Sequence, residues 1–130
     1  MVWRLDAGTL AVLASRSLTS SPQDVALTPD ETELYVANEG GFVDVLNPST
    51  LQSVRRLTLA GLLPFGLAIT ADGAQLYVTS PSTGTLAIVD RLTGAVQVRP
   101  VGGVPRRIAF DASGATAIVS NERNWVDIIR

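Results

Sequence analysis

The stretch from Pro64 to Pro105 reads PFGLAITADGAQLYVTSPSTGTLAIVDRLTGAVQVRPVGGVP, and it decides the fold because it recurs on both sides of itself. Laid beneath it, PQDVALTPDETELYVANEG from Pro22 and PRRIAFDASGATAIVSNER from Pro105 match it position by position. The three prolines are 42 and 41 residues apart. A period of this size is typical of proteins built from one repeated supersecondary unit.

Each unit carries the same series of short apolar segments separated by polar turns. A proline comes before the first segment, where its missing N–H disturbs no ladder of hydrogen bonds. The second strands are predicted at 34–36, 76–78 and 117–119, the third at 43–46, 86–89 and 126–129, and the fourth at 54–59 and 95–101. Four short strands in about 42 residues are the size of one propeller blade. The sequence therefore predicts an all-β propeller of four-stranded antiparallel blades, with about three blades in the chain.

The turns and the first strands fit this architecture. Asp72-Gly73 and Ser113-Gly114 supply a residue that adopts positive φ at little steric cost, whereas Asp30-Glu31 predicts a different or longer turn. The first strands, at 25–27, 67–69 and 108–110, alternate large and small apolar residues. We expect both faces of these innermost strands to be covered by neighbouring blades.

The strings PFGLAITADGAQLYVTSPSTGTLAIVD and PQDVALTPDETELYVANEGGFVDVLN resemble the YVTN-type β-propeller repeat, a WD40-like architecture. The resemblance covers nearly the whole chain. The copy from Pro105 departs from the pattern, since Ile118 replaces its tyrosine and Ser113 its aspartate. The resemblance implies an extracytoplasmic or cell-surface protein, although the first ten residues do not read as a signal peptide.

The repeats predict one partial propeller domain over residues 1–130, with units at 22–63, 64–104 and 105–130 plus 1–21. Residues 3–6 align with 87–90, so the sequence begins and ends in a third strand. Closed propellers use roughly four to eight blades. Two explanations stand: the chain is a piece of a longer propeller, or two copies associate as a homodimer that closes a six-bladed ring. In that ring, residues 3–6 of one copy and residues 126–129 of the other would both occupy the third-strand position of the same blade.

Composition excludes several kinds of chemistry. With no cysteine and no histidine, the chain has no disulfide, no thiolate and no imidazole base or ligand. All ten basic residues are arginine, so no lysine can form a Schiff base or a P-loop. A net charge of −2 and scattered arginines predict no nucleic-acid partner. No apolar run approaches the roughly 18 residues of a membrane helix, so we expect no membrane insertion.

Candidate binding residues belong to the loops before each first strand and after each second strand, which share one face near a propeller's channel. They are Asp24, Asn38, Glu39, Phe65, Arg106, Arg107, Asn121 and Glu122. The arginine pair could bind an anion, and the acidic residues could hold calcium, the one cofactor considered. Each has a plainer interpretation: a solvated charge, or an asparagine bonded to its local backbone. Trp3 and Trp125 are candidate interface residues; alternatively, they are strand residues that fill ordinary packing space.

These observations favour a non-catalytic binding or scaffold module that mediates protein or ligand interaction. No nucleophile has a recognisable activating base, so we expect no enzyme activity and assign no catalytic or metal-binding residue. The alternative is a fragment or subunit of a propeller enzyme, such as a lactonase-like hydrolase, a lyase or a redox-associated subunit. Its catalytic residues would then lie in blades outside this sequence.

Overall fold

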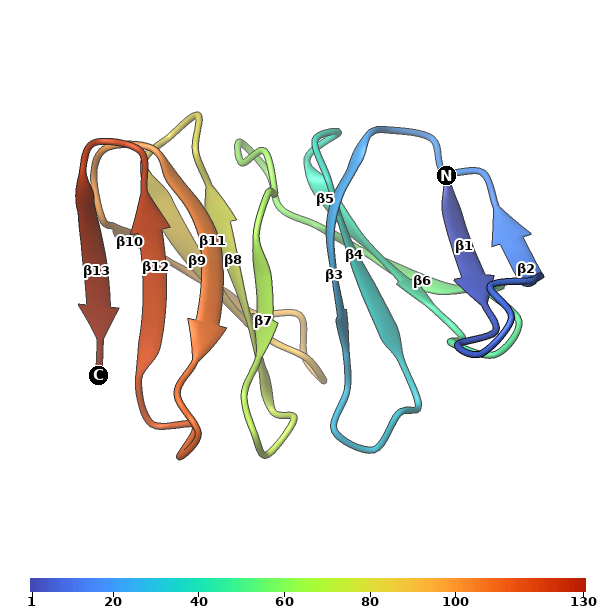
Figure 1. The fold of residues 1–130 in the computed structure, drawn as a ribbon. Coiled ribbons are helices and arrows are strands. Elements are labelled where there is room, and N and C mark those ends of the chain that lie inside the picture. Colours follow the sequence, from blue (N-terminus) through green and yellow to red (C-terminus); the bar gives the residue numbers. More distant parts are fainter.

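The computed structural model describes residues 1–130, and all its regular elements are β-strands in four antiparallel sheets (Figure 1). The N-terminal hairpin consists of β1 (Val2–Leu5) and β2 (Val12–Arg16). Blade I contains β3 (Pro22–Leu27), β4 (Leu34–Asn38), β5 (Phe42–Leu46) and β6 (Ser53–Thr58). Blade II contains β7 (Leu67–Ile69), β8 (Gln75–Ser80), β9 (Thr85–Asp90) and β10 (Val96–Pro100). Blade III contains β11 (Pro105–Phe110), β12 (Ala117–Asn121) and β13 (Trp125–Ile129).

The blades stand side by side in an arc, with the N-terminal hairpin at one end and β13 at the other (Figure 1). Within each blade the strands follow chain order, and β3, β7 and β11 are the first strands. β7 contacts both β3 and β11 across the blades, as expected of strands that line a propeller axis. Directly before β7 the chain approaches β11 so closely that a Cβ on Gly66 would collide with the carbonyl oxygen of Arg106.

The core lies between the blades and not within any one of them. Between blades I and II, alternate residues of the facing strands form one cluster that includes Tyr35, Val43, Val45, Leu76, Val78 and Val89. Between blades II and III, a smaller cluster contains Leu86, Ile108, Ala117 and Val119. Each blade therefore needs a neighbour to cover its apolar side chains. No helix in the structure is long and apolar enough to cross a membrane.

The prediction that Asp30-Glu31 uses a different or longer turn is wrong. Glu31 N–H donates to the carbonyl of Thr28 at 2.8 Å, as Gly73 N–H does to Thr70 at 2.8 Å. Glu31 has a φ of 57°, close to the 70° of Gly73. The first turn thus keeps the geometry of its glycine-containing counterparts, and Glu31 accepts the left-handed conformation that glycine adopts freely.

The turns from third to fourth strand also repeat with the same geometry. The Oδ1 atoms of Asp6, Asn47 and Asp90 each accept hydrogen bonds from two backbone N–H groups and one threonine hydroxyl, all between 2.8 and 3.2 Å. This arrangement in every copy is that of a structural turn. It places the N-terminal hairpin as the third and fourth strands of a blade.

Candidate functional site

The candidate site lies at one end of β3, β7 and β11, where an ionic cluster joins all three blades. Arg107, on β11, reaches the carboxylate of Asp24, on β3, at 3.1 Å and the carbonyl of Gln23 at 3.2 Å. The other carboxylate oxygen of Asp24 accepts the backbone N–H of Leu67 at 3.1 Å. Blade I is therefore connected to blades II and III at this end of the three first strands. We call the surface around Asp24, Leu67 and Arg107 the axial face.

Phe65 is the centre of the axial face. The guanidinium carbon of Arg106 lies 4.6 Å from the centroid of its ring, and that of Arg107 lies 5.2 Å away. Arg106 also forms a two-pronged ion pair with Glu122, at 2.7 and 3.2 Å. The sequence-predicted residues Asp24, Phe65, Arg106, Arg107 and Glu122 are thus in one contiguous cluster.

A pocket of about 290 Å³ opens beside this cluster. It is lined by Glu39, Leu63, Phe65, Pro81, Ser82, Val104 and Arg106. The charge of Arg106 is already balanced by Glu122, whereas Glu39 takes part in no ion pair. The pocket therefore offers apolar walls and one uncompensated negative charge. Leu63, Ser82 and Val104 were not predicted, although each neighbours a loop assigned to this face.

Asn38 and Asn121 do not join the axial pocket. Both are buried, and their amide groups donate to the carboxylates of Asp44 and Asp127, at 2.9 and 3.3 Å. Asn121 Oδ1 also accepts the N–H of Val104 at 2.8 Å, while Asn38 Oδ1 has no partner. The two asparagines hold equivalent positions in blades I and III and brace strand two against strand three.

Two of the three acidic residues considered for calcium, Asp24, Glu39 and Glu122, are held in ion pairs. The structure contains no group of three or more acidic side chains arranged to hold a metal ion. Asp24 and Glu122 each face an arginine instead. Those two carboxylates are therefore held as partners of the arginines on Phe65.

A second ionic cluster, at the interface of blades I and II, was not foreseen from the sequence. Glu33 Oε2 accepts from Tyr35 Oη at 2.6 Å, from Arg91 at 3.0 Å and from Arg55 at 3.2 Å. Burial alone would raise the pKa of Glu33, but the hydrogen bonds from Tyr35 and Arg91 and the two arginine charges outweigh it and lower that pKa. Burial and the bond to Glu33 raise the pKa of Tyr35. This cluster clamps two blades together.

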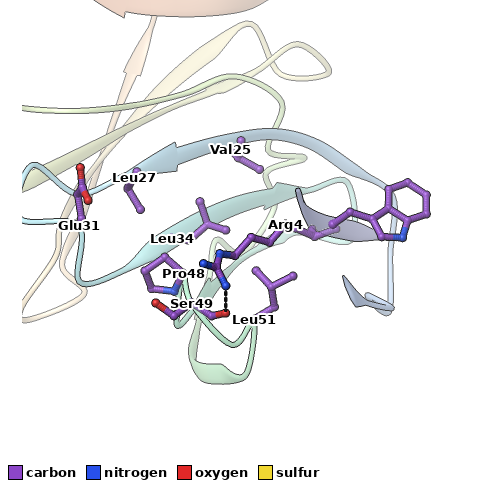
Figure 2. A pocket seen from close by; sticks show the side chains of 10 residues that line it. Arg4, Val25, Leu27, Glu31, Leu34, Pro48, Ser49 and Leu51 are labelled. Atoms are coloured by element: carbon purple, nitrogen blue, oxygen red, sulfur yellow. Dashed lines mark hydrogen bonds between the residues drawn. The ribbon is translucent and has the colours of Figure 1, made fainter. Parts of the chain in front are cut away.

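A larger groove of about 500 Å³ separates the N-terminal hairpin from blade I (Figure 2). Its walls are mostly apolar and include Val2, Trp3, Val25, Leu27, Leu34 and Leu51. Figure 2 shows Arg4 extending across it to donate to the carbonyl of Ser49, at 3.0 Å. Since the hairpin holds the place of strands three and four, the groove lies where strands one and two of its blade would be.

The two tryptophans lie at opposite ends of the arc. Trp3 is 58% exposed on β1. Trp125 is 44% exposed on β13; its indole N–H lies 3.2 Å from both carboxylate oxygens of Asp127, and its ring packs on Gly103. Trp125 therefore has local partners, whereas Trp3 lines the groove beside blade I and is the more exposed of the two.

Comparison with known proteins identifies the fold. No family model and no curated protein matches the chain. Among solved structures, the hydrazine synthase of Kuenenia stuttgartiensis aligns with a TM-score of 0.78 and 24% identity, over 97% of this chain and 36% of that one. The WD40 β-propeller domain of Doa1 aligns with a TM-score of 0.72 and 15% identity, over 85% of this chain and 37% of that one.

These likenesses show the fold and no more. The chain is a β-propeller module of about three blades, each with three or four strands. It spans little more than a third of the length of either solved chain.

Proposed function

We propose that this chain is a non-catalytic binding and scaffold module, built from YVTN-type repeats as one propeller unit over residues 1–130. The LYV segments around Tyr35 and Tyr77 and the third strands that lead to Asn47 and Asp90 support the repeat assignment, since they form equivalent strands and turns in successive blades. A propeller fold alone is compatible with many activities, so the function is argued from the axial face.

The observation that carries the binding role is the pocket beside Phe65. Glu122 and Asp24 pair with Arg106 and Arg107, whereas Glu39, which lines the pocket with Arg106, has no ion-pair partner. The apolar walls fit a hydrocarbon stem, and the free carboxylate fits a positive head group. The ligand class is therefore a basic side chain presented by a protein partner.

This role is tested by titrating the protein with N-acetyl-arginine amide and following its backbone amide signals by NMR. We expect shifts at Glu39, Phe65 and Ser82, and no shifts there with N-acetyl-glutamate amide. Glu39→Gln should weaken the response at least fivefold, because the charge that attracts the ligand is gone. Glu31→Gln, an exposed carboxylate outside this pocket, is the matched control. Equal responses to both amides would contradict the proposal.

We further propose that the propeller functions as a ring completed by a second copy of the chain. The observation in favour is the apolar surface at both ends of the arc. Trp3, Leu5 and Leu13 are 47–58% exposed at the hairpin end. Ile118, Val126 and Ile128 are 42–63% exposed at the other end. Such faces are covered by a neighbouring blade everywhere else in the structure.

A second candidate, part of a propeller enzyme, rests on one observation: the chain aligns over 97% of its length with a structure named as a synthase. A metal-dependent version of this candidate predicts that calcium raises the melting temperature through Glu39. Since Asp24 and Glu122 are each paired with an arginine, we expect no rise in millimolar calcium.

A further inference from the structure

The two ends of the arc differ in which strands of a blade they hold. At one end, β1 pairs with β2 alone, and its other edge faces the groove beside blade I. At the other end, blade III has β11, β12 and β13 but no fourth strand. There a second hollow of about 520 Å³ lies between Ile88, Val101 and Ile129. Within residues 1–130, β1 and β13 therefore each have one edge without a paired strand.

The hairpin end can supply what blade III needs. The repeat alignment makes Val2 of β1 equivalent to Leu86 of β9 and to Val126 of β13. Because Val126 is opposite Ser120 in the β12–β13 ladder, β1 in the same position would set Val2 opposite Ser120. In this register Trp3 and Val119 lie on one face, and Arg4 and Ile118 on the other.

Each face of the combined sheet of β11, β12 and the partner's β1 and β2 would pack against an apolar surface of a neighbouring blade. The Val119 face is the one that packs on blade II, and Trp3 and Leu13 would join it over the hollow beside Ile88. The Ile118 face would fill the groove lined by Val25 and Leu27. Both side chains of that wall, 52% and 44% exposed, would then be covered. Apolar side chains thus meet apolar side chains on both faces.

We propose that two copies of this chain associate by strand exchange: β11 and β12 of one copy enter the partner's groove between β1 and β3, and the partner's β1 replaces β13 beside β12. The inference rests on the ring proposed above and specifies how it closes. Blade III then has β11, β12 and the partner's β1 and β2. Two copies give six four-stranded blades, so the competition between the two third strands is resolved.

β1 and β13 would occupy the same position beside β12, and we infer that β13 is the strand that is displaced. β13 and β1 each have a single strand neighbour and three exposed side chains, so the choice between them rests on how β1 is anchored. β1 is tied to blade I by Arg4, and the hairpin lies over the face that carries the buried Val36 and Leu46. The exchange keeps the number of strand ladders, since the β12–β13 ladder is replaced by one from β12 to β1. The additional apolar burial favours the exchanged form.

The chain has no cysteine, so engineered disulfides give a clean test. The double variant Val2→Cys/Ser120→Cys places the two thiols directly opposite each other only in the exchanged dimer. Under mild oxidation it should give a dimer band on a non-reducing gel, at least tenfold stronger than either single variant. Val2→Cys/Ile128→Cys is the matched control, because β13 pairs with β12 in the single chain and lies beside β1 in neither arrangement, and it should give no such band.

Hydrogen exchange on the unmodified protein provides a second measurement that does not depend on a variant folding. In the exchanged dimer the amides of residues 125–129 lose their ladder and should exchange at least tenfold faster than those of β12.

The outcomes separate the two proposals. A dimeric mass with the predicted cross-link supports the exchange. A dimeric mass with no cross-link and a protected β13 overturns the exchange but leaves the two-copy ring. A monomeric mass overturns both.

Discussion

At the scale of single residues, the turns show where the sequence tolerates strain. Leu10, Leu51 and Gly94 occupy equivalent turn positions, with φ values of 60°, 58° and 74°. The left-handed conformation costs an L-residue about 1–2 kcal/mol. Leu51 is only 2% exposed and gains burial in return, whereas Leu10 is 70% exposed.

We therefore predict opposite effects for the same substitution. Leu10→Gly should raise the free energy of unfolding by about 0.5–1 kcal/mol, because the relief of strain exceeds the entropy cost of glycine. Leu51→Gly should lower it by about 2 kcal/mol or more, through loss of a buried side chain. Urea denaturation of both variants checks this pair. A destabilised Leu10→Gly would mean that the exposed leucine makes a contact that stabilises the fold.

Acid sensitivity is a second property set by individual turns. Hydrogen bonds from the side chains of Thr28 and Thr32 lower the pKa of Asp30 from 3.8 to about 2. Since this pKa is lower in the folded state, the charged carboxylate stabilises the fold above pH 3.8, and the contribution disappears as the pH falls towards 2. Asp30→Asn should flatten stability across this interval. An NMR titration in which Asp30 ionises near 3.8 would contradict the assignment.

The residue scale also shows why one turn was predicted wrongly. Asp72-Gly73 and Ser113-Gly114 indicate a tight turn because glycine fits positive φ. Glu31 gives no such local signal, yet pairing of Leu27 with Leu34 on the flanking strands imposes the same turn on it. Register in the blade, which depends on non-local packing, overrides the local preference.

At the scale of elements, nearly all of the strand pattern could be predicted, because each strand recurs with the period of the repeat. The contacts between blades could not. Arg91 belongs to a turn of blade II, yet it contacts Glu33 and Tyr35 of blade I, and the carbonyl of Gly73 in its own blade. Neither the spacing nor the residue types indicate this interblade clamp, since Arg91 has no counterpart in the other units.

The clamp predicts that Arg91 stabilises the packing of blade I on blade II. Arg91 and Glu33 are 16% and 19% exposed at their side chains, so solvent screens the pair only in part. Arg91→Met should lower the free energy of unfolding by about 2 kcal/mol, because Glu33 and Tyr35 lose a charged donor. Arg123→Met, an exposed arginine with no ion pair, is the control for removal of a positive charge. Equal effects of the two substitutions in denaturant unfolding would show that the clamp adds nothing.

For the candidate site too, the positions of residues within the repeat could be predicted, whereas contacts between blades could not. The repeat places Phe65, Arg106 and Glu122 on one face, because loops of equivalent position meet there. It does not indicate that Arg107 crosses from β11 to Asp24 on β3, which requires the curvature of the arc. Nor does it separate Glu39, which lines the pocket, from the adjacent Asn38, which is buried against Asp44.

At the scale of the whole molecule, the shape of the arc is the basis for the proposed association of two copies. The interior core lies between blades, so the stability of each blade depends on its neighbours. The hairpin and blade III each have one uncovered apolar face, and the register relates them as complementary parts of one blade. A closed two-copy ring covers both faces with the same kind of contact that holds blades I, II and III together.

The most direct test of this account is the absolute mass of the native protein, measured by light scattering across a gel-filtration peak. The account predicts a single species of twice the 13.7 kDa chain mass, unchanged over a tenfold range of protein concentration. A single species of 13.7 kDa would contradict it, because the apolar ends of the arc would then have no second copy to cover them.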